Sequence, residues 1–349
     1  MFVGAEISSC DEYKELIKYA KLNAKALRLV AAYLENEPRL VSASLIESLC
    51  NECSVSSAQA FAGVLSAAFG LDSEISDEDE ILEREYIFRS VKKLDPETYT
   101  CDPYYKNIRI PEVNKGRWEL RYESFAPYEG LIFDDLIIDG YREIPRIGFF
   151  EEEFAFPAVL ENGREWMMIT PNEINTMKEP IAKAHGKVLT FGLGMGYYAY
   201  MASLKEEVES VCVVERDPEV IALFEEFILP QFEHGEKIKI VCSDAFDYAR
   251  RVMPHESFDI AFVDIWHDAL DGLDLYIRMK KLEKESPSTE FVYWVERTLL
   301  STLRAMVISS LEESNQTNAS GVGIYDICEL LRMLSDDYLR SLAADMQRK

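Results

Sequence analysis

Long uncharged apolar runs are missing from this chain of 349 residues. No stretch approaches the roughly 18 to 20 apolar residues that a membrane-spanning helix needs. The N-terminus also lacks the basic and then apolar layout of a secretory signal peptide. We therefore expect a cytoplasmic protein without a membrane anchor. Hydrophobic residues still make up 48% of the chain, which is enough for ordinary cores, and the length suffices for two domains.

Basic side chains are scarce. The chain has 37 lysines and arginines against 63 aspartates and glutamates, which gives a formal net charge of −26. Such a charge repels phosphate backbones and anionic lipids, so nucleic acids and membranes are not expected partners. Residues 41–82 contain no lysine or arginine, so the two short helices expected there are interpreted as packing helices and not as a DNA-binding helix-turn-helix.

A set of two paired cysteine motifs, as in zinc sites, is missing as well. The seven cysteines are odd in number and lie mostly in apolar runs, which is typical of free thiols in a reducing compartment. Cys50 and Cys53 form a Cys-x-x-Cys pair that has neither a second pair nor a nearby histidine. We therefore expect no metal site.

The most informative segment is residues 187–196, Lys-Val-Leu-Thr-Phe-Gly-Leu-Gly-Met-Gly. It predicts a short buried strand that runs into a turn built on Gly192, Gly194 and Gly196. Glycines lack Cβ and allow a sharp turn, and the helix that follows presents unpaired N–H groups. The segment therefore predicts a nucleotide-like ligand close to the backbone.

Three further apolar runs follow, and each ends in an acid: residues 210–215 in Glu215, 237–244 in Asp244 and 258–264 in Asp264. The helical stretches expected between the strands are residues 197–206, 217–229 and 245–253. Strands that alternate with helices predict an α/β fold with a parallel sheet, in which ligands bind at the carboxyl ends of the strands. Any one of these acids alone is better explained as a solvated loop residue than as a ligand contact. Their regular order at successive strand ends is what favours a binding site.

The order of glycine loop, acid, Asp-Ala and Asp resembles the class I S-adenosylmethionine-dependent methyltransferases over residues 186 to about 268. The resemblance implies a Rossmann-like fold and S-adenosylmethionine as the cofactor. It implies contacts of Gly192, Gly194 and Gly196 with the methionine and ribose, Glu215 with the ribose hydroxyls, Asp244 and the Ala245 amide with the adenine, and Asp264 with the methionine or the substrate. A dinucleotide site is disfavoured, because its fingerprint has Gly or Ala where this chain has Tyr197.

The tetrapeptide Ile265-Trp266-His267-Asp268 follows the fourth strand. His267 is a candidate general base, and Asp264 and His267 are together the candidate catalytic residues. Trp266 is a candidate stacking surface for a planar or cationic substrate, and Asp268 is its candidate electrostatic partner. The alternative is a solvent-facing loop whose tryptophan packs on the core.

Three functions are open at this point. The first is methyl transfer to a small molecule, with cationic acceptors included. The second is aminopropyl transfer to a polyamine, because the spermidine synthases share this sheet. Their Asp-x-x-Asp-Pro pattern differs from the Asp264-Ile-Trp-His-Asp268-Ala of this chain. The third is a non-catalytic S-adenosylmethionine-binding protein that regulates a partner.

The expected domains are a helical N-terminal domain at 1–100, a β-rich connector at 101–168 and a Rossmann-like domain with a helical C-terminus at 169–349. Thr170-Pro-Asn-Glu173 has the layout of a capping box and predicts the start of a helix. The segment 166–176 is also a candidate cover for the ligand. Residues 290–313 are predicted as one helix and residues 324–346 as another, so the family's fifth strand is not expected.

Overall fold

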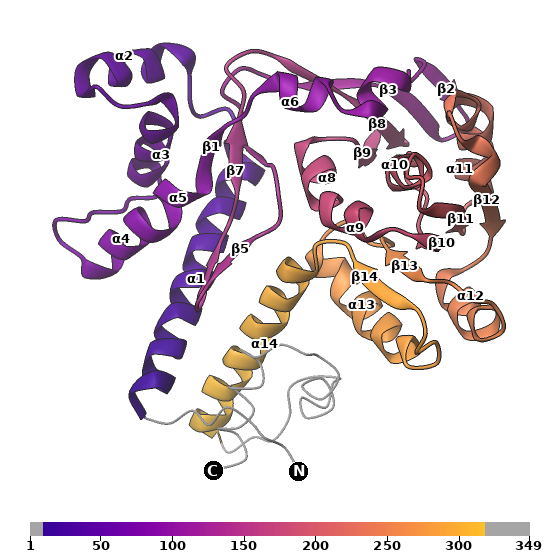
Figure 1. Cartoon of the computed structure of the whole chain (residues 1–349). Coiled ribbons are helices and arrows are strands. Elements are labelled where there is room, and N and C mark those ends of the chain that lie inside the picture. The colour runs from indigo at the N-terminus through magenta and orange to yellow at the C-terminus, as the bar shows by residue number, and fades with distance from the viewer. Residues whose placement is uncertain (1–9, 318–349) are drawn as a thin grey trace. The chain divides into compact units, whose positions relative to one another are not determined.

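The computed structural model describes residues 10–317 and divides the chain into two compact units (Figure 1). The first unit comprises residues 1–92, 136–147 and 296–349, and the second comprises residues 93–135 and 148–295. The domain boundaries expected at residues 100 and 168 stay a prediction. Within the described range, no helix is long and apolar enough to cross a membrane.

The first unit is mainly helical. Its helical segments are α1 (Cys10–Asn36), α2 (Ala43–Cys53), α3 (Ser57–Ala68), α4 (Asp77–Ile81), the π-helix η1 (Leu82–Ile87), α5 (Phe88–Ser90) and α14 (Glu296–Thr317). Ser42 caps the N-terminus of α2, and Ser56 forms a capping box with Gln59 at the start of α3. The hairpin of β5 (Ile137–Asp139) and β6 (Arg142–Ile144) packs on α1 through β6.

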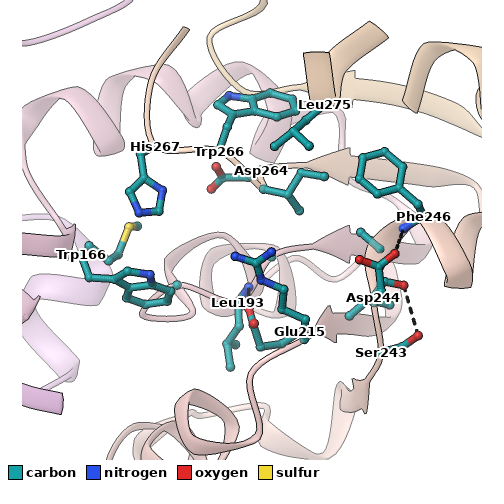
Figure 2. A pocket seen from close by; sticks show the side chains of 17 residues that line it. Trp166, Leu193, Glu215, Ser243, Asp244, Phe246, Asp264, Trp266, His267 and Leu275 are labelled. Atoms are coloured by element: carbon teal, nitrogen blue, oxygen red, sulfur yellow. Dashed lines mark hydrogen bonds between the residues drawn. The ribbon is translucent and has the colours of Figure 1, made fainter. Parts of the chain in front are cut away.

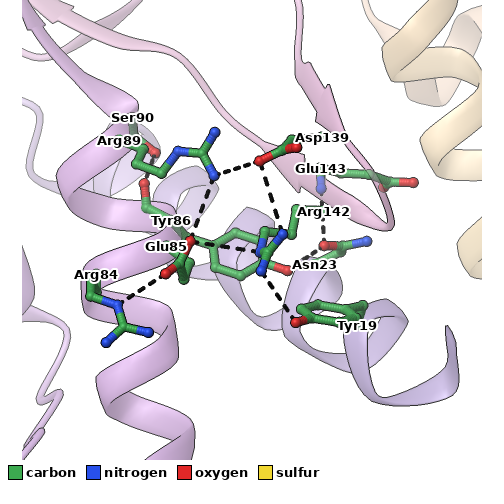
Figure 3. A network of polar contacts seen from close by, with 10 residues as sticks. All are labelled: Tyr19, Asn23, Arg84, Glu85, Tyr86, Arg89, Ser90, Asp139, Arg142 and Glu143. Atoms are coloured by element: carbon green, nitrogen blue, oxygen red, sulfur yellow. Dashed lines mark hydrogen bonds and ion pairs between the residues drawn. The ribbon is translucent and has the colours of Figure 1, made fainter. Parts of the chain in front are cut away.

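A polar network lies next to the apolar core of the first unit (Figure 3). Asn23 is its centre: the Nδ2 amide donates to the Tyr141 carbonyl at 2.8 Å. The Asn23 Oδ1 atom accepts from the Tyr86 hydroxyl at 2.6 Å and from the Glu143 amide at 3.0 Å. The buried Glu143 carboxylate is in turn paired with the buried Arg304. The contacts of Asn23 and Glu143 therefore join α1, η1, β6 and α14.

We expect Tyr86→Phe to lower the free energy of unfolding by about 1 kcal/mol, the usual net worth of a buried hydrogen bond. The reason is that the buried Asn23 Oδ1 atom loses one of its two donors. Tyr33→Phe is the matched control, because its hydroxyl donates to the half-buried Pro38 carbonyl. Chemical denaturation measures both variants, and an equal loss in the two contradicts this role for Asn23.

The second unit contains an antiparallel sheet in the order β2-β3-β8-β9. Its strands are β2 (Val113–Lys115), β3 (Trp118–Phe125), β8 (Phe154–Glu161) and β9 (Arg164–Met168). Short elements precede and interrupt it: α6 (Pro96–Thr100), α7 (Pro103–Asn107) and β4 (Leu131–Ile132). The strands β1 (Val91–Lys93) and β7 (Ile147–Phe149) lie where the chain passes from one unit to the other. The β structure expected in residues 101–168 is present.

The second unit also contains a five-stranded parallel sheet, which confirms the predicted Rossmann-like α/β fold. The strands are β10 (Gly186–Phe191), β11 (Val208–Glu215), β12 (Ile238–Cys242), β13 (Ile260–Val263) and β14 (Glu290–Tyr293). Their order is β12-β11-β10-β13-β14, and every neighbouring pair is parallel. The central strands are continuous apolar runs because helices cover both faces of such a sheet.

The helical segments of this unit connect the strands. They are α8 (Pro171–Thr176), α9 (Lys178–Lys183), α10 (Tyr197–Ser203), α11 (Pro218–Leu223), η2 (Phe224–Ile228), η3 (Leu229–Gln231), η4 (Gly235–Lys237), α12 (Ala245–Arg251), η5 (Met253–His255) and α13 (Ala269–Glu283). Figure 1 shows α10 and α11 on one side of the sheet and α12 and α13 on the other.

The prediction of one helix over residues 290–313 was wrong at its beginning. Residues 290–293 form β14, which pairs with β13 in the register Ile260↔Glu290 to Val263↔Tyr293. Val295 has a φ of 45° and separates this strand from α14, which begins at Glu296. A run of only three apolar residues, 291–293, fits a helix or a strand equally well, and pairing with β13 decides between them. The helix predicted at 324–346 lies outside the described residues.

Candidate functional site

A cavity lies at the carboxyl ends of β10, β11, β12 and β13 (Figure 2). Its volume is about 130 Å³. In the strand order, β11 and β12 lie on one side of β10, and β13 and β14 lie on its other side. This change of direction is the place where ligands bind in open α/β sheets. Asp264, Trp266 and His267 lie opposite Leu193 and Glu215 across the cavity (Figure 2).

Two of the three predicted glycines line the cavity. Gly192 has a φ of 97°, and its amide donates to the Val214 carbonyl at 2.9 Å. A Cβ atom at this position would lie 1.9 Å from the Asp264 carbonyl oxygen. Gly194 has a φ of 50°, and a Cβ there would lie 3.1 Å from the Met167 Cε atom. Residue 192 must therefore be glycine, because a Cβ atom would collide with the neighbouring backbone. At residue 194 the absence of a side chain leaves the backbone exposed to the cavity.

Gly196 has a different position from the one expected. It precedes α10 with a φ of 73° and does not line the cavity. A Cβ atom there would lie 2.3 Å from the Phe224 ring and 3.2 Å from the Phe232 ring. Glycine is thus required at residue 196 because these two rings pack closely against the chain at the beginning of α10.

The Glu215 carboxylate is held in place by two backbone amides. Its Oε2 atom accepts from the Leu193 amide at 3.2 Å, and its Oε1 atom accepts from the Asp217 amide at 2.8 Å. The side chain is buried, and it lines the cavity directly beside the glycine loop. A carboxylate offers about four acceptor positions, so two remain for a ligand. This arrangement suits a pair of neighbouring hydroxyl groups.

Asp244 and Ala245 form the beginning of α12 at the cavity wall. The Asp244 Oδ1 atom accepts from the Phe246 and Asp247 amides at 2.9 and 3.0 Å. Its Oδ2 atom makes no hydrogen bond within residues 10–317. The Ala245 N–H is one of the first helical donors, which have no partner inside the helix. Together the two residues offer an acceptor and a donor side by side.

Asp264 lies at the end of β13, where its amide donates to the Phe191 carbonyl at 2.9 Å. Its carboxylate makes no hydrogen bond among the described residues, and burial raises the pKa of Asp264 to about 7. Trp266 is buried, and its Nε1–H has no acceptor in the described part of the chain. The His267 side chain is exposed and lines the cavity (Figure 2).

Asp268 lies apart from the residues that the sequence grouped with it. It is exposed and does not line the cavity. Its amide donates to Asp271 Oδ1 at 2.9 Å, and its own Oδ1 atom accepts from the Asp271 amide at 3.2 Å. These contacts follow from the position of Asp268 just before α13. The pairing of Asp268 with a substrate that stacks on Trp266 stays a prediction.

The capping box predicted at residues 170–173 was wrong, although α8 begins at Pro171 as expected. Thr170 makes no capping hydrogen bond with its side chain. Glu173 is 7% exposed, its Oε2 atom is buried without a partner, and no hydrogen bond to either of its carboxyl oxygens occurs within the described chain. The spacing Thr-x-x-Glu carries no signal that separates a capping glutamate from one turned into the protein.

One charged residue of the cavity, Arg216, was not predicted from the sequence. Two other residues of the cavity were predicted only as part of the range 166–176. Trp166 and Met167, in the segment 166–176, line the cavity, and Met167 lies over Gly194. Arg216, directly after Glu215, also lines it, and its exposed guanidinium forms no ion pair within residues 10–317. The only sequence signal for Arg216 is that it directly follows an acid at the end of a strand.

No model of a known protein family matches this chain, and no curated protein does. Similar solved structures are spermidine synthase from Thermotoga maritima (16% identity, TM-score 0.29), a spermidine synthase in complex with the transition state analogue AdoDATO (17%, 0.32) and precorrin-8W decarboxylase from Methanobacterium thermoautotrophicum (17%, 0.29). Each match covers 40% of this chain, and the matches cover 53%, 54% and 70% of those chains. The chain thus spans about half the length of the two spermidine synthases. Similarity at these TM-scores does not by itself indicate a function.

Proposed function

We propose that this chain binds S-adenosylmethionine in the cavity and transfers its methyl group to a small-molecule acceptor. The observation that carries the proposal is the placement of Gly192, Glu215, Asp244 and Asp264 around one cavity at four strand ends. The net charge of −26 supports a small acceptor over a nucleic acid.

The free polar atoms of the cavity fit the parts of this cofactor. Glu215 retains acceptor positions for the two ribose hydroxyls, and Asp244 Oδ2 with the Ala245 N–H complements the donor and acceptor edge of adenine. The cavity volume of about 130 Å³ is below the roughly 300 to 1,000 Å³ that is usual for ligand pockets. The flexible Met167 side chain over Gly194 is the part of the wall that moves most readily to enlarge it.

When bound, the cofactor supplies a methyl group activated by a sulfonium. The chain's own residues bind and orient the two reactants and exclude water, and such positioning contributes about 7 to 11 kcal/mol in favourable cases. His267 is placed at the cavity to accept a proton from an acceptor that carries one. Asp264 faces the same space and favours an acceptor or a cofactor group with positive charge.

Aminopropyl transfer to a polyamine is the second candidate. The observation in its favour is that an acid, Asp264, lines the cavity, where it suits a cationic amine, and that Asp264 also acts electrostatically on a second buried acid, Glu173. The departure from the Asp-x-x-Asp-Pro pattern at Asp264-Ile-Trp-His-Asp268-Ala counts against it.

Calorimetric titration tests the proposal. We expect S-adenosylmethionine and S-adenosylhomocysteine to bind with similar affinity at one site, and NAD to give no heat, because the cavity offers contacts for one nucleoside and Tyr197 replaces the small residue of a dinucleotide loop. Binding of NAD alone contradicts the proposed cofactor. A clear preference for decarboxylated S-adenosylmethionine replaces methyl transfer by the aminopropyl alternative.

A further inference from the structure

The glycine loop that follows β10 (residues 192–196) is held by a buried tyrosine from a distant segment. The Met195 carbonyl accepts from the Tyr104 hydroxyl at 2.6 Å, and both side chains are fully buried. The next amide, that of Gly196, donates to the Leu193 carbonyl at 2.8 Å. The peptide unit between Met195 and Gly196 is therefore fixed both at its oxygen and at its N–H.

Tyr104 belongs to α7, a short helix that contacts α10 at both of its ends. Asp102 caps α7: one carboxylate oxygen accepts from the Tyr104 amide at 2.8 Å, and the other accepts from the Tyr197 hydroxyl at 3.0 Å. At the other end, Asn107 Nδ2 donates to the Tyr200 hydroxyl at 2.8 Å. Between these contacts the Tyr104 ring packs edge-on against the rings of Tyr197 and Tyr200, with centroids 5.5 and 5.7 Å away. The direction of the Tyr104 hydroxyl is therefore fixed by packing.

The part of the loop that faces the cavity lies between two side-chain contacts. Gly194 lines the cavity, and its amide makes no hydrogen bond within residues 10–317, so it is free to donate to a ligand. On one side of it, the Leu193 amide donates to Glu215. On the other side, the Met195 carbonyl accepts from Tyr104. Glycine allows a wide range of backbone conformations, so a loop of this composition depends on such contacts to keep one of them.

We propose that Tyr104 is a positioning residue, whose hydrogen bond to Met195 keeps the glycine loop in the conformation that binds the cofactor. The inference rests on the proposed function and deepens it, because it names a residue outside the cavity on which cofactor affinity depends. Tyr104 does not line the cavity, so it acts through Met195 and Gly194 and does not touch the ligand. When a loop spends less time in its binding conformation, the apparent affinity falls by the same factor.

Tyr104→Phe tests this role, because it keeps the ring in its packing and removes only the hydroxyl. The probe is 5′-methylthioadenosine, which contains the nucleoside without the amino-acid part, and calorimetry measures its affinity. We expect the affinity to fall about fivefold, the factor that corresponds to the net contribution of one ordinary hydrogen bond. S-adenosylhomocysteine is expected to lose affinity by the same factor, because the change lies in the loop and not in a contact with one part of the ligand.

Tyr105→Phe is the matched control. The Tyr105 hydroxyl also donates to a backbone carbonyl, that of Ile169 at 2.5 Å, but this carbonyl lies outside the glycine loop. Chemical denaturation is expected to show a loss of stability in both variants, since each loses one hydrogen bond to a carbonyl. The affinity for methylthioadenosine is expected to change only in Tyr104→Phe, which a purely structural role of the two tyrosines does not explain.

The outcomes separate this role from the proposed function. Failure of methylthioadenosine to bind the wild type overturns the nucleoside site and the positioning role together. Binding to the wild type, with equal affinities in Tyr104→Phe and Tyr105→Phe, overturns the positioning role alone. Asn107→Ala is the second variant should Tyr104→Phe not fold, because it removes the contact of α7 with Tyr200. We expect it to lower the affinity about threefold, and an unchanged affinity contradicts the role of α7.

Amide hydrogen exchange of the ligand-free protein gives an independent readout. The Gly196 amide is protected by its bond to the Leu193 carbonyl, and this bond opens more often when the adjoining Met195 carbonyl loses Tyr104. We expect peptides that contain residues 193–196 to exchange faster in Tyr104→Phe than in Tyr105→Phe, while peptides from β11 exchange equally in the two. Equal exchange in the loop, or an equal increase in β11, contradicts a specific effect on the glycine loop.

Discussion

Gly192→Ala is expected to lower the free energy of unfolding by at least about 4 kcal/mol, which is at the extreme of single substitutions. A Cβ atom at residue 192 would lie 1.9 Å from the Asp264 carbonyl oxygen, which is backbone and cannot turn aside. The Gly192 amide and the Asp264 amide are also fixed to neighbouring strands, by the Val214 and Phe191 carbonyls at 2.9 Å each. Relief of the clash must therefore separate β10 from β13. Chemical denaturation of the whole chain measures the loss.

Two glycine variants separate this clash from ordinary backbone strain. Gly163→Ala has a φ of 74° with nothing within 4 Å of the new Cβ atom, so it reports strain alone, about 1 kcal/mol. Gly194→Ala places its Cβ 3.1 Å from Met167 Cε, the end of a flexible side chain that can move. We expect both to remain well above Gly192→Ala in stability. A Gly192→Ala variant no less stable than Gly163→Ala contradicts the close approach of the two strands.

The parallel sheet was predictable from sequence because its signals are local. Four apolar runs with turn residues at their ends indicate buried strands, and the alternation with helices indicates parallel pairing. Gly192, Glu215, Asp244 and Asp264 then converge as a consequence of topology, since parallel strands end at one edge. The positions of these residues around one cavity follow from the order of the elements along the chain.

The features that were missed depend on contacts distant in sequence. Residues 290–293 become a strand only because β13 offers an unpaired edge, and nothing within the four residues reports this. Glu173 has a sequence context typical of a helix cap, yet its side chain is buried, and its pKa is raised by burial and by the charge of Asp264, 91 residues further along. Gly196 likewise has the spacing of a ligand contact, and its neighbours turn out to be Phe224 and Phe232. Side-chain direction is the property that spacing leaves undetermined.

Glu215→Ala is expected to reduce the affinity for 5′-methylthioadenosine at least about 100-fold. A hydrogen bond to a charged group contributes about 1.5 to 3 kcal/mol, and a ribose diol makes two of them with one carboxylate. The substitution also removes the acceptor of the Leu193 amide, which lies in the glycine loop at 3.2 Å from Glu215 Oε2. The loop then loses the contact that fixes its distance from the end of β11. Calorimetric titration at constant pH measures the change.

Glu209→Ala is the matched control for this prediction, because Glu209 is an exposed acid on the same strand, β11, and does not line the cavity. It removes the same charge from the chain, so any general effect of net charge on binding appears in both variants. Glu215→Gln separates the two roles of the carboxylate: it keeps one acceptor oxygen for the Leu193 amide and loses the charge that faces the cavity. We expect its affinity to lie between those of the wild type and Glu215→Ala. A folded Glu215→Ala variant that binds methylthioadenosine as tightly as Glu209→Ala removes the nucleoside from this strand end and, with it, the cofactor proposed for the cavity.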